Sequence, residues 1–302
     1  MMEVKFMTIV ERRKNNIEIF KNTMELCHTH PKLRGGIKNS IEEQVVLDEK
    51  APYWFDEKLL VSYEEKAKIV VSEKRSFEAA REYARVGKKV CVLNFADWTT
   101  PGGWVLKGAS AQEESLCRCS TLYPCISDPN VENFYASHKA EKKKNPMHIL
   151  HNDDLIYTPN VTVFKSDTDM PEILPEEEWY QVDVISCAAP RLRLRSADQK
   201  KLGLTSDVLE IEEEELRRIL DSRIRRIIES ARYCSGGSIE VLILGGFGCG
   251  AFRNPPEFVA QTFNKVINDF IYDFEIIEFP IFHKNKEVAN YEAFCKYITS
   301  EQ

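Results

Sequence analysis

The chain has 302 residues, of which 43% are hydrophobic and 29% are charged. This composition is typical of a globular protein with a sizeable core, and it excludes disorder along the whole chain. The 41 basic and 48 acidic residues leave a formal net charge of −7, which excludes a general nucleic-acid coat protein. A polyanionic ligand would therefore have to bind at a local basic patch or at backbone amides.

Several features of the sequence bear on its compartment and partners. No apolar run reaches the roughly 20 residues of a membrane helix, so we expect no membrane contact. The nine cysteines form no small-domain disulfide pattern, which predicts reduced thiols in the cytoplasm, or in the nucleus if the source is eukaryotic. Cys27, His28 and His30 lack a matching downstream pair, so we predict no metal site. We expect a monomer.

Short runs of β-branched residues alternate with helical patterns along the chain. They predict buried strands at Val90–Phe95, Val161–Phe164, Val182–Ala188, Ile239–Leu244 and Ile276–Phe282. Apolar residues recur at helical spacing in 216–231 and in 259–270. This alternation predicts an α/β sheet covered by helices on both faces.

Three further segments of the chain give more specific predictions. Residues 1–89 look mainly helical, and we predict an N-terminal extension that packs on a core formed by residues 90–302 as one structural unit. In the last helical pattern, Asn254 is expected to cap the helix, with Pro255 at the first helical position and Glu257 at capping-box spacing. The acidic segment Asp167–Trp179 is expected to be a surface loop.

Ligands of open α/β sheets bind where parallel strands deliver their carboxyl ends. Here the strand at 239–244 runs into G-G-F-G-C-G-A-F-R-N-P-P, whose four glycines precede a helix. Such a loop can hold phosphate with its N–H groups, or it can be a plain tight turn. The strand at 90–95 runs into A-D-W-T-T-P-G-G-W, and Glu113 and Glu114 follow soon after it. Two carboxylates beside a glycine turn are candidates for acid–base catalysis, or they begin a solvated helix.

The segment P-G-G-W-V-L-K-G-A-S-A-Q-E-E-S-L-C-R-C-S-T-L-Y resembles the signature of the microbial-type poly(ADP-ribose) glycohydrolases. L-G-G-F-G-C-G-A-F-R-N-P-P resembles the second phosphate loop of that family, and V-L-N-F-A, Y-T-P-N-V-T-V-F and V-I-S-C-A-A-P follow the family order. The resemblance runs from about Asn39 to Phe294. It implies a three-layer α/β/α macrodomain-like mixed sheet and the hydrolysis of ribose–ribose O-glycosidic bonds, without cofactor or metal.

The resemblance also implies roles for individual residues. Glu114 would be the catalytic acid, Glu113 would hold ribose hydroxyls, and Asn94 would contact the distal ribose. Adjacent helical residues point about 100° apart, so one carboxyl performing both proton steps fits better than two flanking carboxylates. The substrate would be poly(ADP-ribose) or another ADP-ribosylated macromolecule, and the product ADP-ribose. The other ligand-binding residues implied by the resemblance are Gly102, Gly103, Trp104, Gln112, Gly246, Gly248, Cys249, Gly250, Ala251 and Phe252.

Trp104 departs from the family pattern, which has a third glycine at this position. A positive φ would be costly for tryptophan. Trp104 would close over the ligand, narrow the substrate range, abolish turnover, or pack outward after a small shift of the loop. The alternatives to polymer hydrolysis are therefore an ADP-ribose reader without turnover and a hydrolase of single ADP-ribose marks. Arg191 is a second departure, at a position where a smaller polar residue is expected.

Three arginines alternate with two leucines in the segment A-P-R-L-R-L-R, which follows the strand at 182–188. In extended backbone this alternation puts Arg191, Arg193 and Arg195 on one side. Guanidinium groups match the geometry of phosphate, so the row is expected to contact a pyrophosphate of the polymer outside the catalytic pocket. Alternatively, the arginines pair with acidic residues, such as those in Glu210–Glu215.

Overall fold

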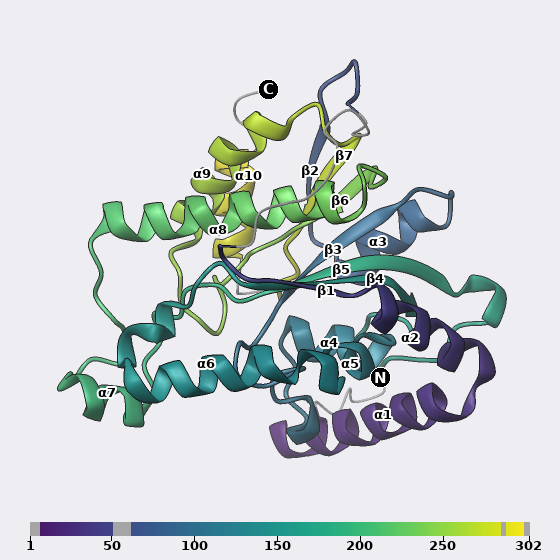
Figure 1. Cartoon of the computed structure of the whole chain (residues 1–302), viewed down its shortest axis with the longest axis horizontal. Helices are drawn as coiled ribbons and strands as arrows, with labels where there is room; N and C mark the ends of the chain where they lie inside the picture. Colours follow the sequence, from purple (N-terminus) through teal and green to yellow (C-terminus); the bar gives the residue numbers. More distant parts are fainter. Residues whose placement is uncertain (1–6, 51–61, 285–287, 299–302) are drawn as a thin grey trace, which may run out of the picture.

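A seven-stranded mixed sheet forms the centre of the computed structural model, which describes residues 7–50, 62–284 and 288–298 (Figure 1). The strand order is β1-β4-β5-β3-β6-β7-β2. The strands are β1 (Val45–Leu47), β2 (Lys68–Ser72), β3 (Val90–Phe95), β4 (Leu155–Val163), β5 (Tyr180–Cys187), β6 (Val241–Ile243) and β7 (Ile276–Pro280). β4 is antiparallel to β1 and β5, and all other neighbours are parallel. The five predicted strands are therefore confirmed, although β4 begins earlier and β6 is shorter than expected.

Helices cover both faces of this sheet, as predicted. α8, α9 and α10 lie on one face, and α1, α3, α4 and α5 lie on the other (Figure 1). The described helices are α1 (Ile9–Thr29), α2 (Pro31–Glu43), α3 (Ser76–Ala84), α4 (Gln112–Cys119), α5 (Leu122–Ile126), α6 (Glu132–Lys144), α7 (Ser196–Leu202), α8 (Glu213–Cys234), α9 (Pro256–Ile267) and α10 (Ala289–Ile298). None of them, within the described part of the chain, has the length and apolar character needed to cross a bilayer.

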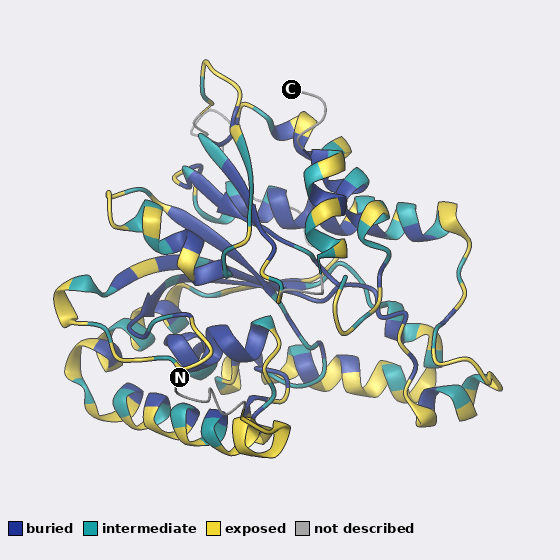
Figure 2. Ribbon diagram, turned by 180° about the vertical axis from the view of Figure 1, so that it is seen from behind, coloured by how far each residue is buried: buried dark blue, intermediate teal, exposed yellow. Residues whose placement is uncertain are grey.

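Successive residues of β3 point to opposite faces of the sheet and so join two separate cores. Val90 and Val92 pack in the cluster of the α3 and α4 side, whereas Cys91 and Leu93 pack in the cluster of the α8 and α9 side. This strand is therefore apolar at every position down to Leu93, which is the pattern of a strand buried on both faces. Figure 2 shows the same strands as the buried centre of the molecule.

The segment before residue 90 contributes more than helices. β1 pairs with β4 at one edge of the sheet, and β2 pairs with β7 at the other edge. The sequence analysis did not identify these two strands. The α1 helix is joined to the sheet by the buried Lys165, whose ammonium donates to Asn22 Oδ1 at 2.9 Å and Thr23 Oγ1 at 2.8 Å. The division at residue 90 stays a prediction.

The cap predicted for the helix that follows the second glycine loop, α9, is wrong. α9 begins at Pro256, with Pro255 as its N-cap and no side-chain capping bond. Asn254 is buried and turned away from the helix, and its amide donates to Pro190 O at 2.8 Å and Gly248 O at 3.1 Å. The Asn254 side chain therefore joins the loop after β6 to the segment after β5, and it supplies the donor for Pro190 O, whereas Gly248 O also accepts from the backbone N–H of Asn254.

Candidate active site

The carboxyl ends of the five parallel strands meet at one cavity of about 1180 Å³. Residues that follow each strand line it: Phe95 at the end of β3, Ala189 after β5, Gly246 after β6, Ile281 after β7 and Lys74 after β2. This is the edge at which α/β sheets bind ligands. Ligand pockets usually measure roughly 300–1,000 Å³, so the cavity has room for a ligand of nucleotide size or larger.

Most of the residues implied by the resemblance lie on the wall of this cavity. They are Gly103, Trp104, Gln112, Glu113, Glu114, Gly246, Gly248, Gly250, Ala251 and Phe252. Three of the implied residues, Asn94, Gly102 and Cys249, are not part of its described lining. Asn94 is fully buried beside Glu113. Cys249 is also enclosed, and burial raises the pKa of its thiol, which disfavours a nucleophilic thiolate.

The paired carboxylates lie in the first turn of α4, and both are buried. Glu113 is 3% exposed and its Oε2 accepts a hydrogen bond from the N–H of Asp97 at 2.7 Å. Its Oε1 lies 3.5 Å from the amide nitrogen of Asn94. Glu114 is 7% exposed, and its Oε1 accepts from the N–H of Trp104 at 2.9 Å. Its Oε2 is buried and has no hydrogen-bond partner within the described residues.

Burial dominates the protonation of both groups. It raises the pKa of Glu113 well above the ordinary value, against the hydrogen bond from Asp97. Burial likewise raises the pKa of Glu114, although the N–H of Trp104 and the positive charge of Arg118 act in the opposite direction. The effect of burial on the pKa of Glu114 is therefore larger than the opposing effects of the hydrogen bond from Trp104 and of Arg118. The raised pKa favours a Glu114 carboxyl that holds a proton closer to neutral pH.

The glycine turn before α4 is shaped by these two carboxylates. Gly103 has a φ of 57°, and a Cβ at this residue would lie 2.7 Å from Glu114 Oε1 and 2.9 Å from Glu113 Oε2. Gly102 has a φ of 67°, and its Cβ would lie 2.7 Å from the ring of Tyr123. Only glycine fits here, because both the backbone conformation and the available space exclude a side chain.

Trp104 takes the place of the third glycine without backbone strain. Its φ is −108°, so the expectation of a costly positive φ does not apply. The indole is 43% exposed at the rim of the cavity, while the N–H of the same residue bonds to Glu114. Lys107 Nζ lies 4.5 Å and Arg195 Cζ 5.5 Å from the centre of the indole ring. Trp104 thus leaves the position of Glu114 intact and adds an aromatic surface at the opening.

Gln112 joins α4 to the end of β3. Its Oε1 accepts from the N–H of Phe95 at 2.9 Å, and its Nε2 donates to Leu93 O at 2.8 Å and Ser76 Oγ at 3.1 Å. The amide group is therefore committed to the protein at both ends. Gln112 lines the cavity, yet these bonds make it a residue that positions the carboxylates that follow it.

The second glycine loop lines the same cavity as the start of α4. Gly248 has a φ of 76°, and a Cβ there would lie 2.4 Å from Asn254 Nδ2 and 2.6 Å from Ala189 Cβ. The carbonyl of Phe252 accepts from the N–H groups of Leu192 at 3.0 Å and Arg193 at 3.1 Å. These contacts hold the loop against the segment after β5, so its shape is set before any ligand binds.

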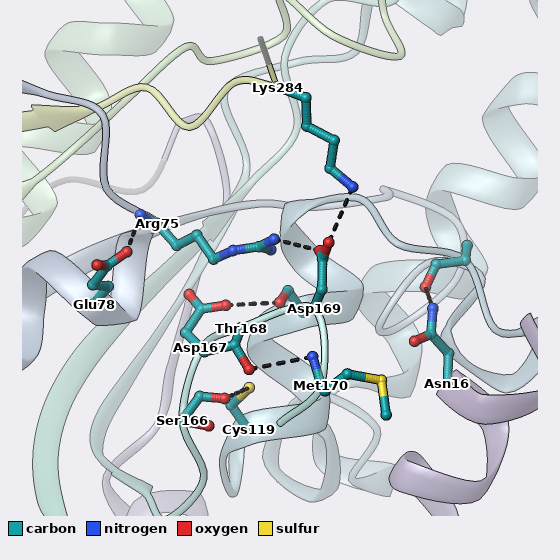
Figure 3. Close-up of polar contacts among 12 residues, drawn as sticks. Asn16, Arg75, Glu78, Cys119, Ser166, Asp167, Thr168, Asp169, Met170 and Lys284 are labelled. Atoms are coloured by element: carbon teal, nitrogen blue, oxygen red, sulfur yellow. Dashed lines mark hydrogen bonds and ion pairs between the residues drawn. The ribbon is translucent and has the colours of Figure 1, made fainter. Parts of the chain in front are cut away.

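The segment that follows β4 also reaches the cavity wall, and Figure 3 shows its polar contacts. Asp167 is buried and accepts from Ser115 Oγ at 2.8 Å. Asp169 accepts from Arg75 at 2.5 Å and pairs with Lys284 at 3.1 Å (Figure 3). The prediction of a surface loop is therefore wrong at Asp167, which lines the cavity together with Arg75. Sequence reasoning missed both residues, because they lie far from the glycine motifs along the chain.

The arginine row is only partly as predicted. Leu192 and Leu194 are buried and Arg193 and Arg195 are exposed, which is the expected alternation. Arg191, however, is 4% exposed and pairs with Asp198 at 2.6 Å, so it is not on the exposed side with the other two. The alternative, pairing with acidic residues, therefore holds for Arg191, although its partner Asp198 lies outside 210–215; Arg193 and Arg195 form no ion pair with a described carboxylate.

The described part of the chain holds no cluster of three or more histidine, cysteine or carboxylate side chains arranged to bind a metal ion.

Comparisons with known proteins agree with this geometry. A family model described as "Microbial-type PARG, catalytic domain" matches residues 14–166, half of the chain. A solved structure of poly(ADP-ribose) glycohydrolase (PARG) from Thermomonospora curvata is 28% identical, with 94% of this chain and 100% of that chain covered and a TM-score of 0.75. No curated protein matches the chain.

Two further similar structures hold bound ligands. The Thermomonospora curvata enzyme bound to the inhibitor ADP-HPD is 29% identical, covers 94% of this chain and 99% of that chain, and has a TM-score of 0.73. PARG from Deinococcus radiodurans in complex with ADP-ribose is 26% identical, covers 88% of this chain and 97% of that chain, and has a TM-score of 0.70. On the family match, the chain belongs to the microbial-type poly(ADP-ribose) glycohydrolases.

Proposed function

We propose that the protein hydrolyses the ribose–ribose O-glycosidic bonds of poly(ADP-ribose) and releases ADP-ribose, with Glu114 as general acid and base. The observation that carries this proposal is the carboxyl of Glu114, which is buried in the cavity wall with its Oε2 unpaired. Family membership and the ADP-ribose complex of the Deinococcus radiodurans enzyme support the ligand class. No metal or cofactor takes part in the proposed steps.

In the proposed reaction one carboxyl performs two proton transfers. Glu114, in its neutral form, donates its proton to the oxygen that bridges the two riboses. The bond between this oxygen and the anomeric carbon breaks, and its electron pair stays on the oxygen. Water then attacks the positively charged anomeric centre, and the Glu114 carboxylate takes the proton that the water loses. The pyrophosphate of the ligand would stabilise the positive charge on the sugar.

The remaining residues of the site are proposed to hold the substrate. Glu113 would bind ribose hydroxyls, because its carboxylate is fixed by the N–H of Asp97 in the cavity wall. Asn94 is not part of the described lining of the cavity; it is proposed to contact the distal ribose through its Oδ1, which has no partner among the described residues. The N–H groups of the second glycine loop would bind a phosphate of the same ligand, with Phe252 against the nucleotide.

The geometry also bears on the two alternatives. A reader without turnover requires that Trp104 disturbs the acid, yet the N–H of Trp104 supports Glu114 at 2.9 Å. Hydrolysis of single marks would use the same acid, so only a substrate test separates it from polymer hydrolysis. Purified poly(ADP-ribose) and mono-ADP-ribosylated protein, each incubated with the enzyme, should release free ADP-ribose from the polymer. Release from the single mark alone would refute the polymer assignment, and no release from either would indicate a reader.

We further propose that the protein acts as a monomer in the cytoplasm, with residues 1–89 as an extension of the core at 90–302. No disulfide joins any cysteine in the described part of the chain, which agrees with a reducing compartment. The bonds of Lys165 to α1 support one structural unit. Light scattering after size-exclusion chromatography tests the monomer, and a mass of twice 34.9 kDa would refute it.

A further inference from the structure

We propose that Trp104, Lys107, Arg193 and Arg195 form a second anion-binding subsite at the rim of the cavity, for the pyrophosphate of the substrate portion that leaves. This proposal rests on the proposed function, since it assumes that the bond broken at Glu114 joins two ADP-ribose units. It goes beyond that function by naming where the second unit binds. Trp104 stands where the signature that the chain resembles has glycine, and its indole supplies a surface that glycine lacks.

The position of the indole relative to the acid supports this assignment. The backbone N–H of Trp104 bonds to Glu114 Oε1 at 2.9 Å, so the residue that carries the indole is in direct contact with the group that protonates the leaving oxygen. The carboxyl of Glu114 is buried, whereas the indole is 43% exposed at the opening of the cavity. One unit of the polymer has to lie inside the cavity and the other outside it, with the acid between them. Trp104 therefore lies on the side from which the second unit departs.

Trp104 gathers positive charge from two different loops. Lys107 Nζ lies over the indole at 4.5 Å from the ring centre, and it belongs to the loop between β3 and α4. Arg195 Cζ lies over the indole at 5.5 Å from the ring centre, and it comes from the segment after β5. Cation–π contacts of this length are attractive and restrict the long side chains. The indole thus holds two cationic groups at one place on the rim.

Arg193 and Arg195 also differ from Arg191 and Arg75, which line the same cavity, because neither is paired with a carboxylate. Arg191 is paired with Asp198 at 2.6 Å, and Arg75 is paired with Asp169 at 2.5 Å. Arg193 and Arg195 line the cavity, are exposed, and form no ion pair with a described carboxylate. In a chain of net charge −7, a local group of uncompensated cations attracts an anion, and guanidinium forks suit phosphate oxygens.

This arrangement distinguishes a polymer from its product. Free ADP-ribose has one pyrophosphate, which the cavity and the second glycine loop would bind. A polymer has a further pyrophosphate in the leaving portion, and the rim subsite would bind that one. Loss of a rim cation should therefore weaken binding of the polymer and leave binding of free ADP-ribose nearly unchanged.

The test measures binding of both ligands in the Glu114→Gln background, where turnover does not deplete the polymer. Affinities of purified poly(ADP-ribose) and of free ADP-ribose are recorded between about 50 and 200 mM salt. Arg195→Gln should lower polymer affinity about tenfold, the worth of one charge-assisted hydrogen bond. It should also reduce the slope of log affinity against log salt by about 0.7. Affinity for ADP-ribose should stay within about twofold of the background.

Trp104→Ala should have the same selective effect, because it releases both cations, and Trp104→Phe should restore most of the polymer affinity. The matched control is Arg218→Gln, which removes an exposed arginine of α8 that pairs with Glu215 at 2.8 Å. It has the same change of net charge and should alter neither affinity. Retained ADP-ribose binding shows in each variant that the protein is folded.

Two results would overturn the subsite. Equal loss of affinity for both ligands would put Arg195 in the ADP-ribose pocket, and no loss for either ligand would leave the rim without a binding role. Failure of the proposed function looks different. An enzyme that releases no ADP-ribose, yet loses polymer affinity selectively in Arg195→Gln, would refute hydrolysis and retain the subsite.

Discussion

The substitution Gly103→Ala tests whether the glycine turn exists to make room for the two carboxylates. The added Cβ would lie 2.7 Å from Glu114 Oε1 and 2.9 Å from Glu113 Oε2, whereas ordinary contact begins at about 3.4 Å. The two oxygens would therefore have to retreat by roughly 0.7 and 0.5 Å, the differences between these values. A displacement near 1 Å at a reacting group can cost about 10²-fold, so we expect turnover to fall by roughly 10- to 100-fold.

Alanine at a positive φ also destabilises the fold, by about 1–2 kcal/mol, and a control has to separate that effect. Gly236 serves for this purpose, because its φ of 63° is close to the 57° of Gly103 and a Cβ there would meet nothing within 4 Å. Gly236→Ala should lose only this backbone term in urea unfolding and Gly103→Ala at least as much, and only Gly103→Ala should lose release of ADP-ribose from the polymer. Full turnover in a folded Gly103→Ala protein, or an equal loss in Gly236→Ala, would refute the reasoning.

Two further predictions concern stability. Burial raises the pKa of Glu113, so the folded state binds a proton that the unfolded chain releases, and this stability is lost as pH rises through the folded pKa. Glu113→Gln should therefore raise the thermal midpoint of unfolding relative to wild type at about pH 8 and change it little at about pH 4. A shift of equal size at both pH values would contradict this prediction. Asn254→Ala should cost about 1–3 kcal/mol in urea unfolding and lower ADP-ribose affinity, because Pro190 O loses the amide donor of Asn254 and Gly248 O keeps only the backbone N–H of the same residue; unchanged values would refute that role.

The strands and helices of the central sheet could be predicted from the sequence because their apolar patterns are local. β3, for example, is apolar from Val90 to Leu93, and α8 has one apolar stripe. β1 could not be predicted in this way, since it has three residues and its Val45 and Val46 are exposed. It forms a strand because it pairs with β4, and this pairing depends on the tertiary structure. β2 is different, because its Ile69, Val70 and Val71 form a β-branched run that is a local strand signal; the sequence analysis missed it.

The candidate site could be predicted where glycines and carboxylates occur together along the chain. Gly103, Glu113 and Glu114 therefore needed no structure to be singled out. Arg75 and Asp167 could be recognised only from the structure, because only the folded sheet brings the segments after β2 and β4 to the same cavity. Single side chains were the least predictable part. Asn254 has the sequence context of a helix cap, yet buried carbonyls of two loops compete for its amide and bind it instead.

The proton transfer by Glu114 is tested most directly by comparing Glu114→Gln with wild type on purified poly(ADP-ribose). Glutamine keeps the size of the side chain and can accept from the N–H of Trp104, but it cannot donate an acidic proton. Release of ADP-ribose should fall by roughly 10²- to 10⁴-fold, the usual worth of a positioned acid–base group, while affinity for free ADP-ribose should be retained. Wild-type release by Glu114→Gln would contradict the proposal, because the proton would then have to come from another group.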